Sequence, residues 1–150
     1  MKEIANEKRL RRFVRECPYC HGKMLKRDKK YVYGIVWGKN EWVWVCENYP
    51  RCSSYVGCHP NTDIPLGRVA DHNLREWKKR THRVFDVLWK SHHMSRRTAY
   101  VWLSEKLGIP QSDCHIGMFD EDLCRQAIKV CKCVDSPEIR AYKNRVRKQR

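Results

Sequence analysis

Two pairs of cysteines decide the fold of this chain: Cys17-Pro18-Tyr19-Cys20 and, after a spacer, Cys46-Glu47-Asn48-Tyr49-Pro50-Arg51-Cys52. Structural zinc prefers four soft ligands arranged as a tetrahedron about 2.3 Å from the metal. Two short cysteine loops held together by strands supply that arrangement. One pair alone is weak support for a site, whereas two pairs that flank a predicted hairpin are strong support. The spacing therefore predicts one structural Zn2+ bound by Cys17, Cys20, Cys46 and Cys52.

The alternative interpretation is that these cysteines are buried free thiols. The chain has nine cysteines, an odd number that does not suit a framework of disulfides. Metal ligands and small buried side chains explain them better, in a reducing compartment. Four thiolates would leave zinc no open position for water, so we expect this metal not to be catalytic.

The spacer between the cysteine pairs predicts a β-hairpin. Aromatic and β-branched residues run over Tyr31–Trp37 and again over Trp42–Cys46. The segment Gly38–Glu41 between them has the composition of a turn. We expect the two runs to be the paired strands of a zinc ribbon.

The second half of the chain predicts three amphipathic helices. Asp71, Ser95 and Asp120 are good N-cap residues, and each precedes apolar residues at three-and-four spacing. Gly108 and Pro110 are expected to end the second helix. The expected fold class is α+β, a zinc ribbon followed by a small three-helix module. The expected organisation is a basic arm over 1–15, the ribbon over 16–58, a connector over 59–72, the three-helix module over 73–134 and a solvated or partner-bound basic tail over 135–150.

A longer pattern surrounds the cysteine pairs. It consists of Cys17, Pro18, Cys20, Gly22 and Met24, followed by Cys46, Asn48, Tyr49, Pro50 and Cys52. This pattern resembles the C-terminal zinc ribbons of bacterial type IA topoisomerases, except that His21 stands where a glycine is usual. The resemblance implies the ribbon, its zinc ligands and affinity for single-stranded DNA. It does not imply topoisomerase activity, because the chain is too short for the large domain that surrounds the nucleophilic tyrosine.

A second set of short motifs extends over most of the chain. It includes Tyr55-Val56-Gly57-Cys58-His59-Pro60, Leu107-Gly108-Ile109 and Cys114-His115-Ile116-Gly117-Met118-Phe119-Asp120. These motifs resemble a small family of phage and prophage proteins described only as zinc-finger-containing. The resemblance implies phage origin and a ribbon joined to a helical module, and it implies no particular reaction.

The charge of the chain indicates a polyanionic partner. Among 150 residues, 32 Lys and Arg stand against 17 Asp and Glu, a formal net charge of +15. Each phosphate that such a protein neutralises releases condensed counterions, which favours binding. Nucleic acid is therefore the expected partner, with single-stranded DNA favoured and RNA or duplex DNA as alternatives. A soluble basic protein whose charge only keeps it dispersed is the competing interpretation.

Basic and aromatic residues on the ribbon and on the first helix are the candidate contacts to nucleic acid. Trp42 and Trp44 could stack on bases, or they could pack against the helices as an interdomain core. The cationic candidates are Lys26, Arg27, Lys29, Lys30, Lys39 and Arg51 on the ribbon, and Arg75, Lys79 and Arg83 on the outward face of the helix.

Two Cys-His pairs, Cys58-His59 and Cys114-His115, are candidates for a second zinc site if the fold brings them together. The alternative is that the thiols are buried and the imidazoles are hydrogen-bonded to backbone.

A nuclease is the least favoured function. His82 and Asp86 have helical i,i+4 spacing, and His59 could pair with Asp63 or Asp71. Nothing assembles these residues into a metal-nuclease pattern, so we expect no enzymatic activity. The main alternative to nucleic-acid binding is a module that docks onto a host or phage protein and inhibits or recruits a nucleic-acid-processing or defence enzyme.

The sequence also predicts where the protein acts. No stretch of about 18 apolar residues is present, which excludes a membrane-spanning helix. The segment Met1–Arg15 is mixed in charge and has no apolar core, unlike a secretory signal. We therefore expect no membrane partner and a location in the cytosol of a bacterial host.

Overall fold

The computed structural model describes residues 2–34 and 41–149. The chain forms two compact units, Met1–Arg75 and Glu76–Arg150. The boundary between them falls inside helix α3 (His72–Phe85). The class is α+β, as the sequence predicts: a three-stranded antiparallel sheet with a four-cysteine cluster, followed by helices.

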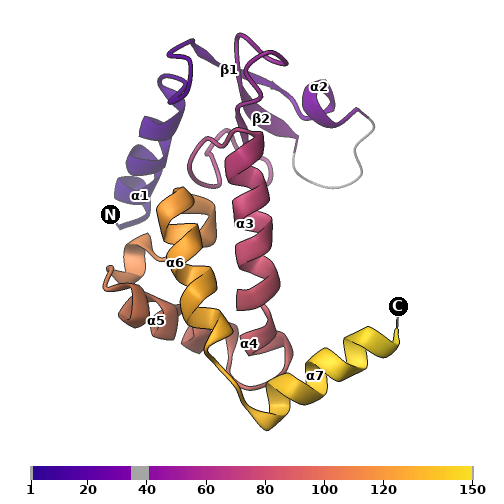
Figure 1. Ribbon diagram of the computed structural model, residues 1–150. Coiled ribbons are helices and arrows are strands. Elements are labelled where there is room, and N and C mark those ends of the chain that lie inside the picture. The colour runs from indigo at the N-terminus through magenta and orange to yellow at the C-terminus, as the bar shows by residue number, and fades with distance from the viewer. Residues whose placement is uncertain (1, 35–40, 150) are drawn as a thin grey trace. The chain divides into compact units, whose positions relative to one another are not determined.

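The sheet of the first unit has the order β1-β2-β3 (Figure 1). Strand β1 (Met24–Asp28) pairs with β2 (Trp42–Cys46), with Met24 opposite Cys46 and Asp28 opposite Trp42. Strand β3 (Tyr55–Gly57) pairs with the other edge of β2. Side chains alternate between faces along a strand, which buries Val43 and Val45 of β2 and leaves Trp42 and Trp44 half-buried.

The predicted first strand of the hairpin is wrong. The start of the expected strand Tyr31–Trp37 belongs instead to a single helical turn, α2 (Lys30–Tyr33). Residues 35–40, which include Trp37, Gly38, Lys39 and Asn40, lie outside the described residues. The strand that pairs with β2 is β1, which begins directly after the first cysteine loop. Met24, four residues after Cys20, lies opposite Cys46. Strand propensity alone could not reveal that constraint, since it depends on where the two cysteine pairs meet.

The core of the first unit includes residues from both segments that flank the ribbon, the expected arm and the expected connector. The expected basic arm contains α1 (Lys2–Arg11) and a 3-10 turn, η1 (Arg12–Val14). Val14 packs with Val69 of the expected connector. The connector is joined to the ribbon by bridges between Tyr55 and Ala70 and between Cys58 and Pro65. The buried cluster consists of Val14, Cys17, Met24, Cys46 and Val69, with Trp44, Cys52 and Val56 packed against it.

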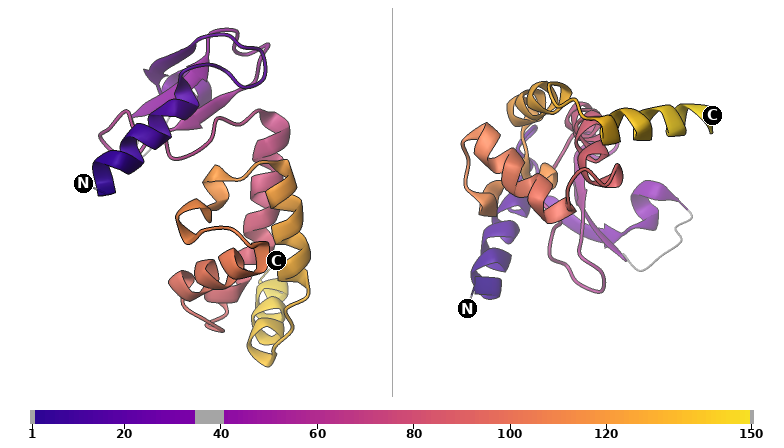
Figure 2. Two further views of the ribbon diagram at one scale, coloured as in Figure 1. Left: turned by 90° about the vertical axis from the view of Figure 1, so that its left-hand side faces the viewer. Right: turned by 90° about the horizontal axis from the view of Figure 1, so that it is seen from below.

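The second unit is helical. Beyond its share of α3 it contains α4 (Val87–Lys90), α5 (Arg96–Leu107), α6 (Glu121–Lys132) and α7 (Pro137–Lys148), with 3-10 turns η2 (Gln111–Asp113) and η3 (Ile116–Met118). Helix α6 lies beside the C-terminal part of α3 (Figures 1 and 2), where the Thr81 hydroxyl donates to the Cys124 carbonyl. Phe85, Leu88, Leu103, Ile116 and Phe119 are fully buried. Among the described residues, no helix has the length and apolar character needed to cross a bilayer.

The three predicted helices form, and the predicted residues cap them. The Asp71 carboxylate accepts from the Leu74 N–H at 2.8 Å. Ser95 and Asp120 accept in the same way at the starts of α5 and α6, and Gly108 ends α5 with a φ of 65°. Each cap satisfies an N–H group that the first turn of a helix leaves without a partner.

The tail over 135–150, expected to be solvated or partner-bound, is mostly helical. Ser136 caps α7 by accepting from the Ile139 N–H, and Pro137 occupies the first turn. Ile139 is 2% exposed and anchors the helix, which contacts α4. Most of the other side chains of α7 are exposed, so the tail presents its positive charges from a defined helix.

Candidate functional site

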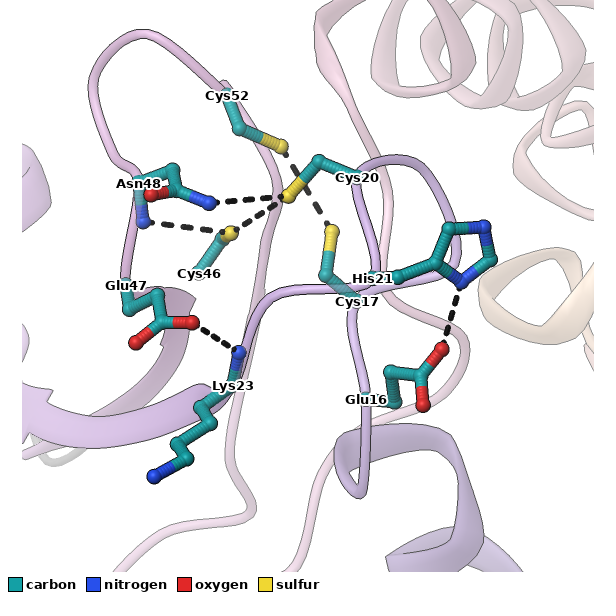
Figure 3. Close-up of polar contacts among 9 residues, drawn as sticks. All are labelled: Glu16, Cys17, Cys20, His21, Lys23, Cys46, Glu47, Asn48 and Cys52. Atoms are coloured by element: carbon teal, nitrogen blue, oxygen red, sulfur yellow. Dashed lines mark hydrogen bonds and ion pairs between the residues drawn. The ribbon is translucent and has the colours of Figure 1, made fainter.

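The four predicted zinc ligands meet at one end of the sheet (Figure 3). Their sulfur atoms all lie within 4.8 Å of one another. Cys17 Sγ lies 3.6 Å from Cys52 Sγ, and Cys20 Sγ lies 3.3 Å from Cys46 Sγ. Zinc–sulfur bonds of about 2.3 Å in a tetrahedron place the sulfurs about 3.8 Å apart. The cluster therefore fits one structural Zn2+, and no other group of three or more potential ligands gathers in the described part of the chain.

The first cysteine loop is a tight turn with two special positions. The Cys17 N–H donates to the Gly22 carbonyl, and the His21 N–H donates to the Cys17 carbonyl. His21 has a φ of 62°, in the left-handed region that glycine adopts more easily than other residues. That conformation explains why a glycine suits this position. A Cβ on Gly22 would lie 2.8 Å from Asn48 Nδ2, so this glycine makes room for the second loop.

Asn48 holds two of the sulfurs. Its side-chain Nδ2 donates to Cys20 Sγ at 3.4 Å, and its backbone N–H donates to Cys46 Sγ at 3.5 Å (Figure 3). The first of these bonds is the main reason that the pKa of the exposed Cys20 thiol falls to about 6. Burial raises the pKa of Cys46. Hydrogen bonds of this kind orient metal ligands and favour their deprotonated form.

The residues of the proposed second zinc site are divided between the two units. Cys58 and His59 belong to the first unit and Cys114 and His115 to the second, so neither unit assembles the set. Both thiols are buried, and burial raises the pKa of each to about 11. The His115 ring packs at a tilt on Tyr100, with 5.4 Å between ring centroids. A second zinc site therefore remains a prediction.

The predicted cations of the ribbon lie at its surface. Lys26, Arg27, Lys30 and Arg51 are exposed, and Lys29 is half-buried. Lys39 lies outside the described residues.

The two tryptophans of β2 are engaged within the first unit. Trp44 packs against the buried cluster, and its Nε1 donates to the Asp63 carbonyl at 2.7 Å. The Lys26 ammonium lies 4.8 Å from the centroid of the Trp42 ring. Both rings are half-buried, so they offer less free surface for stacking than the sequence suggests.

Four tyrosines of this unit pack together, two of them exposed and two half-buried. We call Tyr31, Tyr33, Tyr49 and Tyr55 the tyrosine cluster. Ring centroids are 5.9 Å apart for Tyr31 and Tyr49, 6.3 Å for Tyr49 and Tyr55, and 5.6 Å for Tyr55 and Tyr33. Tyr31 and Tyr33 are 52% and 49% exposed. Such tilted and edge contacts order the rings without covering them.

Cations flank the tyrosine cluster. The Arg27 guanidinium lies 5.3 Å from the centroid of Tyr31, and the Lys29 ammonium lies 5.6 Å from that of Tyr33. Arg75 stacks 3.8 Å from the centroid of Tyr55 while its Nη1 donates to the Ser53 and Ala70 carbonyls. Arg75 thus positions the cluster instead of pointing outward from the helix.

The other two helical candidates, Lys79 and Arg83, are exposed and line a groove with α7. His82 and Asp86, the i,i+4 pair, lie in the same groove, with His82 Nδ1 3.1 Å from an Asp86 carboxylate oxygen. The pair therefore forms as its spacing indicates.

Sequence reasoning did not identify Tyr49 and Tyr55 as members of an aromatic cluster, or Lys143 and Arg147 as neighbours of Arg83. Only the fold brings the tyrosines next to α2. The helix that carries Lys143 and Arg147 did have a signal, because Ser136-Pro137 is a typical N-cap followed by proline at the first helical position.

A family model described as a zinc-finger-containing domain matches residues 13–134. The match includes the four zinc ligands, the tyrosine cluster and the three predicted helices. No curated protein and no solved structure matches the chain.

Proposed function

This chain belongs to the zinc-finger-containing domain family DUF3268, and from that premise we propose that it binds single-stranded nucleic acid through its zinc ribbon. Single-stranded DNA is the favoured ligand, with RNA as the nearest alternative. The zinc has a structural role, because four thiolates leave no open coordination position. The ribbon therefore contributes a surface and not a reactive metal.

The tyrosine cluster with its flanking cations is the observation that carries this proposal. Proteins that bind single strands without strong base readout combine positive charge along the backbone with aromatic rings on which bases stack. Tyr31 and Tyr33 supply exposed rings, and Arg27 and Lys29 supply charge directly beside them.

Fluorescence anisotropy with labelled single-stranded DNA, duplex DNA and RNA over a salt series tests the proposal. We expect the single strands to bind more tightly than the duplex at each salt concentration. Tyr31→Ala and Tyr33→Ala should each weaken single-strand binding by about 1 to 3 kcal/mol, because each removes a stacking ring. The salt slope should change little, since a ring releases no counterions.

Two controls separate stacking from folding. Tyr31→Phe keeps the ring and should keep most of the affinity. Leu66→Ala removes an exposed apolar side chain of the same unit that lies outside the cluster and should leave binding unchanged. Normal binding by both tyrosine-to-alanine variants would rule out stacking on this surface, and no binding of any polymer at physiological salt would rule out the proposed function.

We propose that the protein has no nuclease activity. The zinc ligands saturate the metal, and the carboxylate of Asp86 is paired with His82 and Lys90. Labelled DNA incubated with magnesium or manganese should stay intact. Cleavage that disappears in His82→Ala or His59→Ala would contradict this.

We further propose that the protein works in the cytosol of a phage-infected bacterium. The resemblance to phage proteins and the nine cysteines support this, because thiolate zinc ligands persist best where thiols stay reduced. Fractionation of infected cells with an antibody to the protein would test it.

A second candidate function is docking onto a protein partner. A groove of about 600 Å3 between α5 and α6 is lined by the half-buried apolar side chains Trp102, Leu107, Val130 and Val134, with Lys106 and Lys129 among the other lining residues. Apolar side chains that gather at a surface groove often mark an interaction site. If this function is the real one, Trp102→Ala should abolish co-purification of a partner from infected cells, and the tyrosine variants should not.

A further inference from the structure

The second unit contains a groove in which positive charge gathers. The groove has a volume of about 740 Å3 and is bordered by α3 and α4 on one side and α7 on the other. Five cationic side chains line it, together with the apolar side chains Val87, Tyr142 and Val146 and one acidic side chain, Asp86. The cations are Lys79, Arg83, Lys90, Lys143 and Arg147. We call this the α3–α7 groove.

The cations of the groove differ in how they are paired. Lys79 forms an ion pair with Glu76 at 2.7 Å. Lys90 Nζ lies 3.7 Å from one Asp86 carboxylate oxygen, and His82 Nδ1 lies 3.1 Å from the other. Arg83, Lys143 and Arg147 have no ion-pair or hydrogen-bond partner among residues 2–34 and 41–149. Three cations of the groove are therefore free to bind an anion.

The cations are spaced so that they form rows along the groove. Lys79 and Arg83 are four residues apart on α3, and Lys143 and Arg147 are four residues apart on α7. Residues at this spacing lie on one helical face, about 5 to 6 Å apart at their Cβ atoms. The groove thus has a row of two cations on each wall, and Lys90 of α4 extends one row.

We propose that the α3–α7 groove binds consecutive phosphates of a nucleic-acid backbone. This inference rests on the proposed function and adds to it a phosphate site in the helical unit, separate from the stacking surface of the ribbon. Arginine guanidinium groups match the geometry of phosphate oxygens. The two rows of cations complement a linear polyanion better than a single small anion, which would leave most of them unpaired.

Charge variants test the groove. Arg83→Gln, Lys143→Gln and Arg147→Gln each remove one free cation while retaining a long side chain with good helix propensity. The matched control is Arg97→Gln, at an exposed site on α5 outside the groove, which makes the same change in net charge. Binding of single-stranded DNA is measured by anisotropy over a salt series, and circular dichroism melting checks the fold of each variant.

We expect each groove variant to lower the slope of log affinity against log salt by about 0.7, the value of one phosphate contact on a single strand. Arg97→Gln should leave the slope nearly unchanged. Asp86→Asn should act in the opposite direction and tighten binding, because it removes the negative charge that faces the phosphates and releases Lys90. A residue with a merely structural role would not strengthen binding when substituted.

Each outcome separates this inference from the function on which it rests. If the unmodified protein binds no nucleic acid at any salt concentration, the proposed function fails and the groove proposal fails with it. If it binds, and the groove variants match Arg97→Gln in affinity and slope while the tyrosine variants lose affinity, only the groove proposal is wrong. Binding of poly-glutamate that is lost in the groove variants, with DNA binding unchanged, would also overturn it in favour of an acidic protein ligand.

Discussion

Cys46 and Cys133 carry the same thiol in different surroundings. Cys46 lies in the zinc cluster and in the buried core, whereas Cys133 is exposed at the end of α6. Replacement of a ligand by serine removes a thiolate and leaves zinc with three. We expect the first unit to depend on the metal because two of the ligands, Cys17 and Cys46, belong to its buried cluster.

We predict that Cys46→Ser loses zinc and that Cys133→Ser retains one zinc per chain. Structural zinc contributes on the order of 10 kcal/mol or more to the folding of small ribbons, so the first variant should also lose the fold of its sheet. Elemental analysis of protein purified without chelator measures the metal. Retention of a full equivalent of zinc in Cys46→Ser would contradict the assignment, and two equivalents in the unmodified protein would favour the second site.

Asn48 controls how readily the zinc site takes up protons. Its hydrogen bond is the main cause of the low pKa of Cys20, about 6 compared with an ordinary value of 9.0. Zinc binding competes with protonation of its ligands. Loss of this bond raises the pKa of Cys20 toward its ordinary value, so protons compete with zinc at a higher pH.

We therefore predict that Asn48→Ala releases zinc at a higher pH than the unmodified protein during acidification. A zinc-sensitive dye in the solution reports the midpoint. Gln126→Ala, which removes an exposed amide from the second unit, is the control and should keep the original midpoint. A midpoint in Asn48→Ala that is unchanged or lower would show that the hydrogen bond does not stabilise the thiolate.

At the scale of single elements, α7 is a helix that one buried side chain anchors. Eleven of its twelve residues are exposed or half-buried, and Ile139 alone is buried. One buried residue thus connects this highly charged helix to the rest of the second unit. Its place beside α4 is what forms one wall of the α3–α7 groove.

We predict that Ile139→Ala destabilises the second unit by about 2 to 5 kcal/mol, the usual effect of truncating a buried isoleucine. Val146→Ala, an exposed truncation on the same helix, should change stability by about 0.5 kcal/mol or less. Urea unfolding followed by circular dichroism measures both. If Ile139→Ala unfolds like Val146→Ala, α7 is not anchored as described.

At the scale of the whole molecule, the two units depend on different sources of stability. The core of the first unit includes zinc ligands. The second unit rests on buried apolar side chains such as Phe85, Leu103 and Phe119 and contains no part of the cluster. Removal of the metal should therefore affect the units unequally.

We predict that a strong chelator abolishes hydrogen-exchange protection in β1, β2 and β3 but preserves it in α5 and α6. The reason is that metal binding is part of the folding free energy of the ribbon only. Mass spectrometry of deuterium uptake with and without chelator separates the two regions, and re-addition of zinc is the control. Equal loss of protection in both regions would show that the chain folds as one cooperative whole.

The sequence by itself determined the zinc ligands, the α+β class, the three main helices and their caps. Each of these depends on residue type and short spacing: thiols in pairs, apolar residues at helical period, and Asp71, Ser95 and Asp120 directly before them. Such signals are local, and the physical interactions behind them act within one or two turns of chain.

The tertiary structure decided which strand pairs with β2, how the tyrosine cluster assembles and where the tail runs. Met24 lies opposite Cys46 because the metal ligands must meet, and Tyr31 contacts Tyr49 only because of that pairing. Arg83 and Lys143 line one groove although 59 residues separate them between α3 and α7. Contacts at such separations depend on packing of the whole unit, and no local period or propensity encodes them.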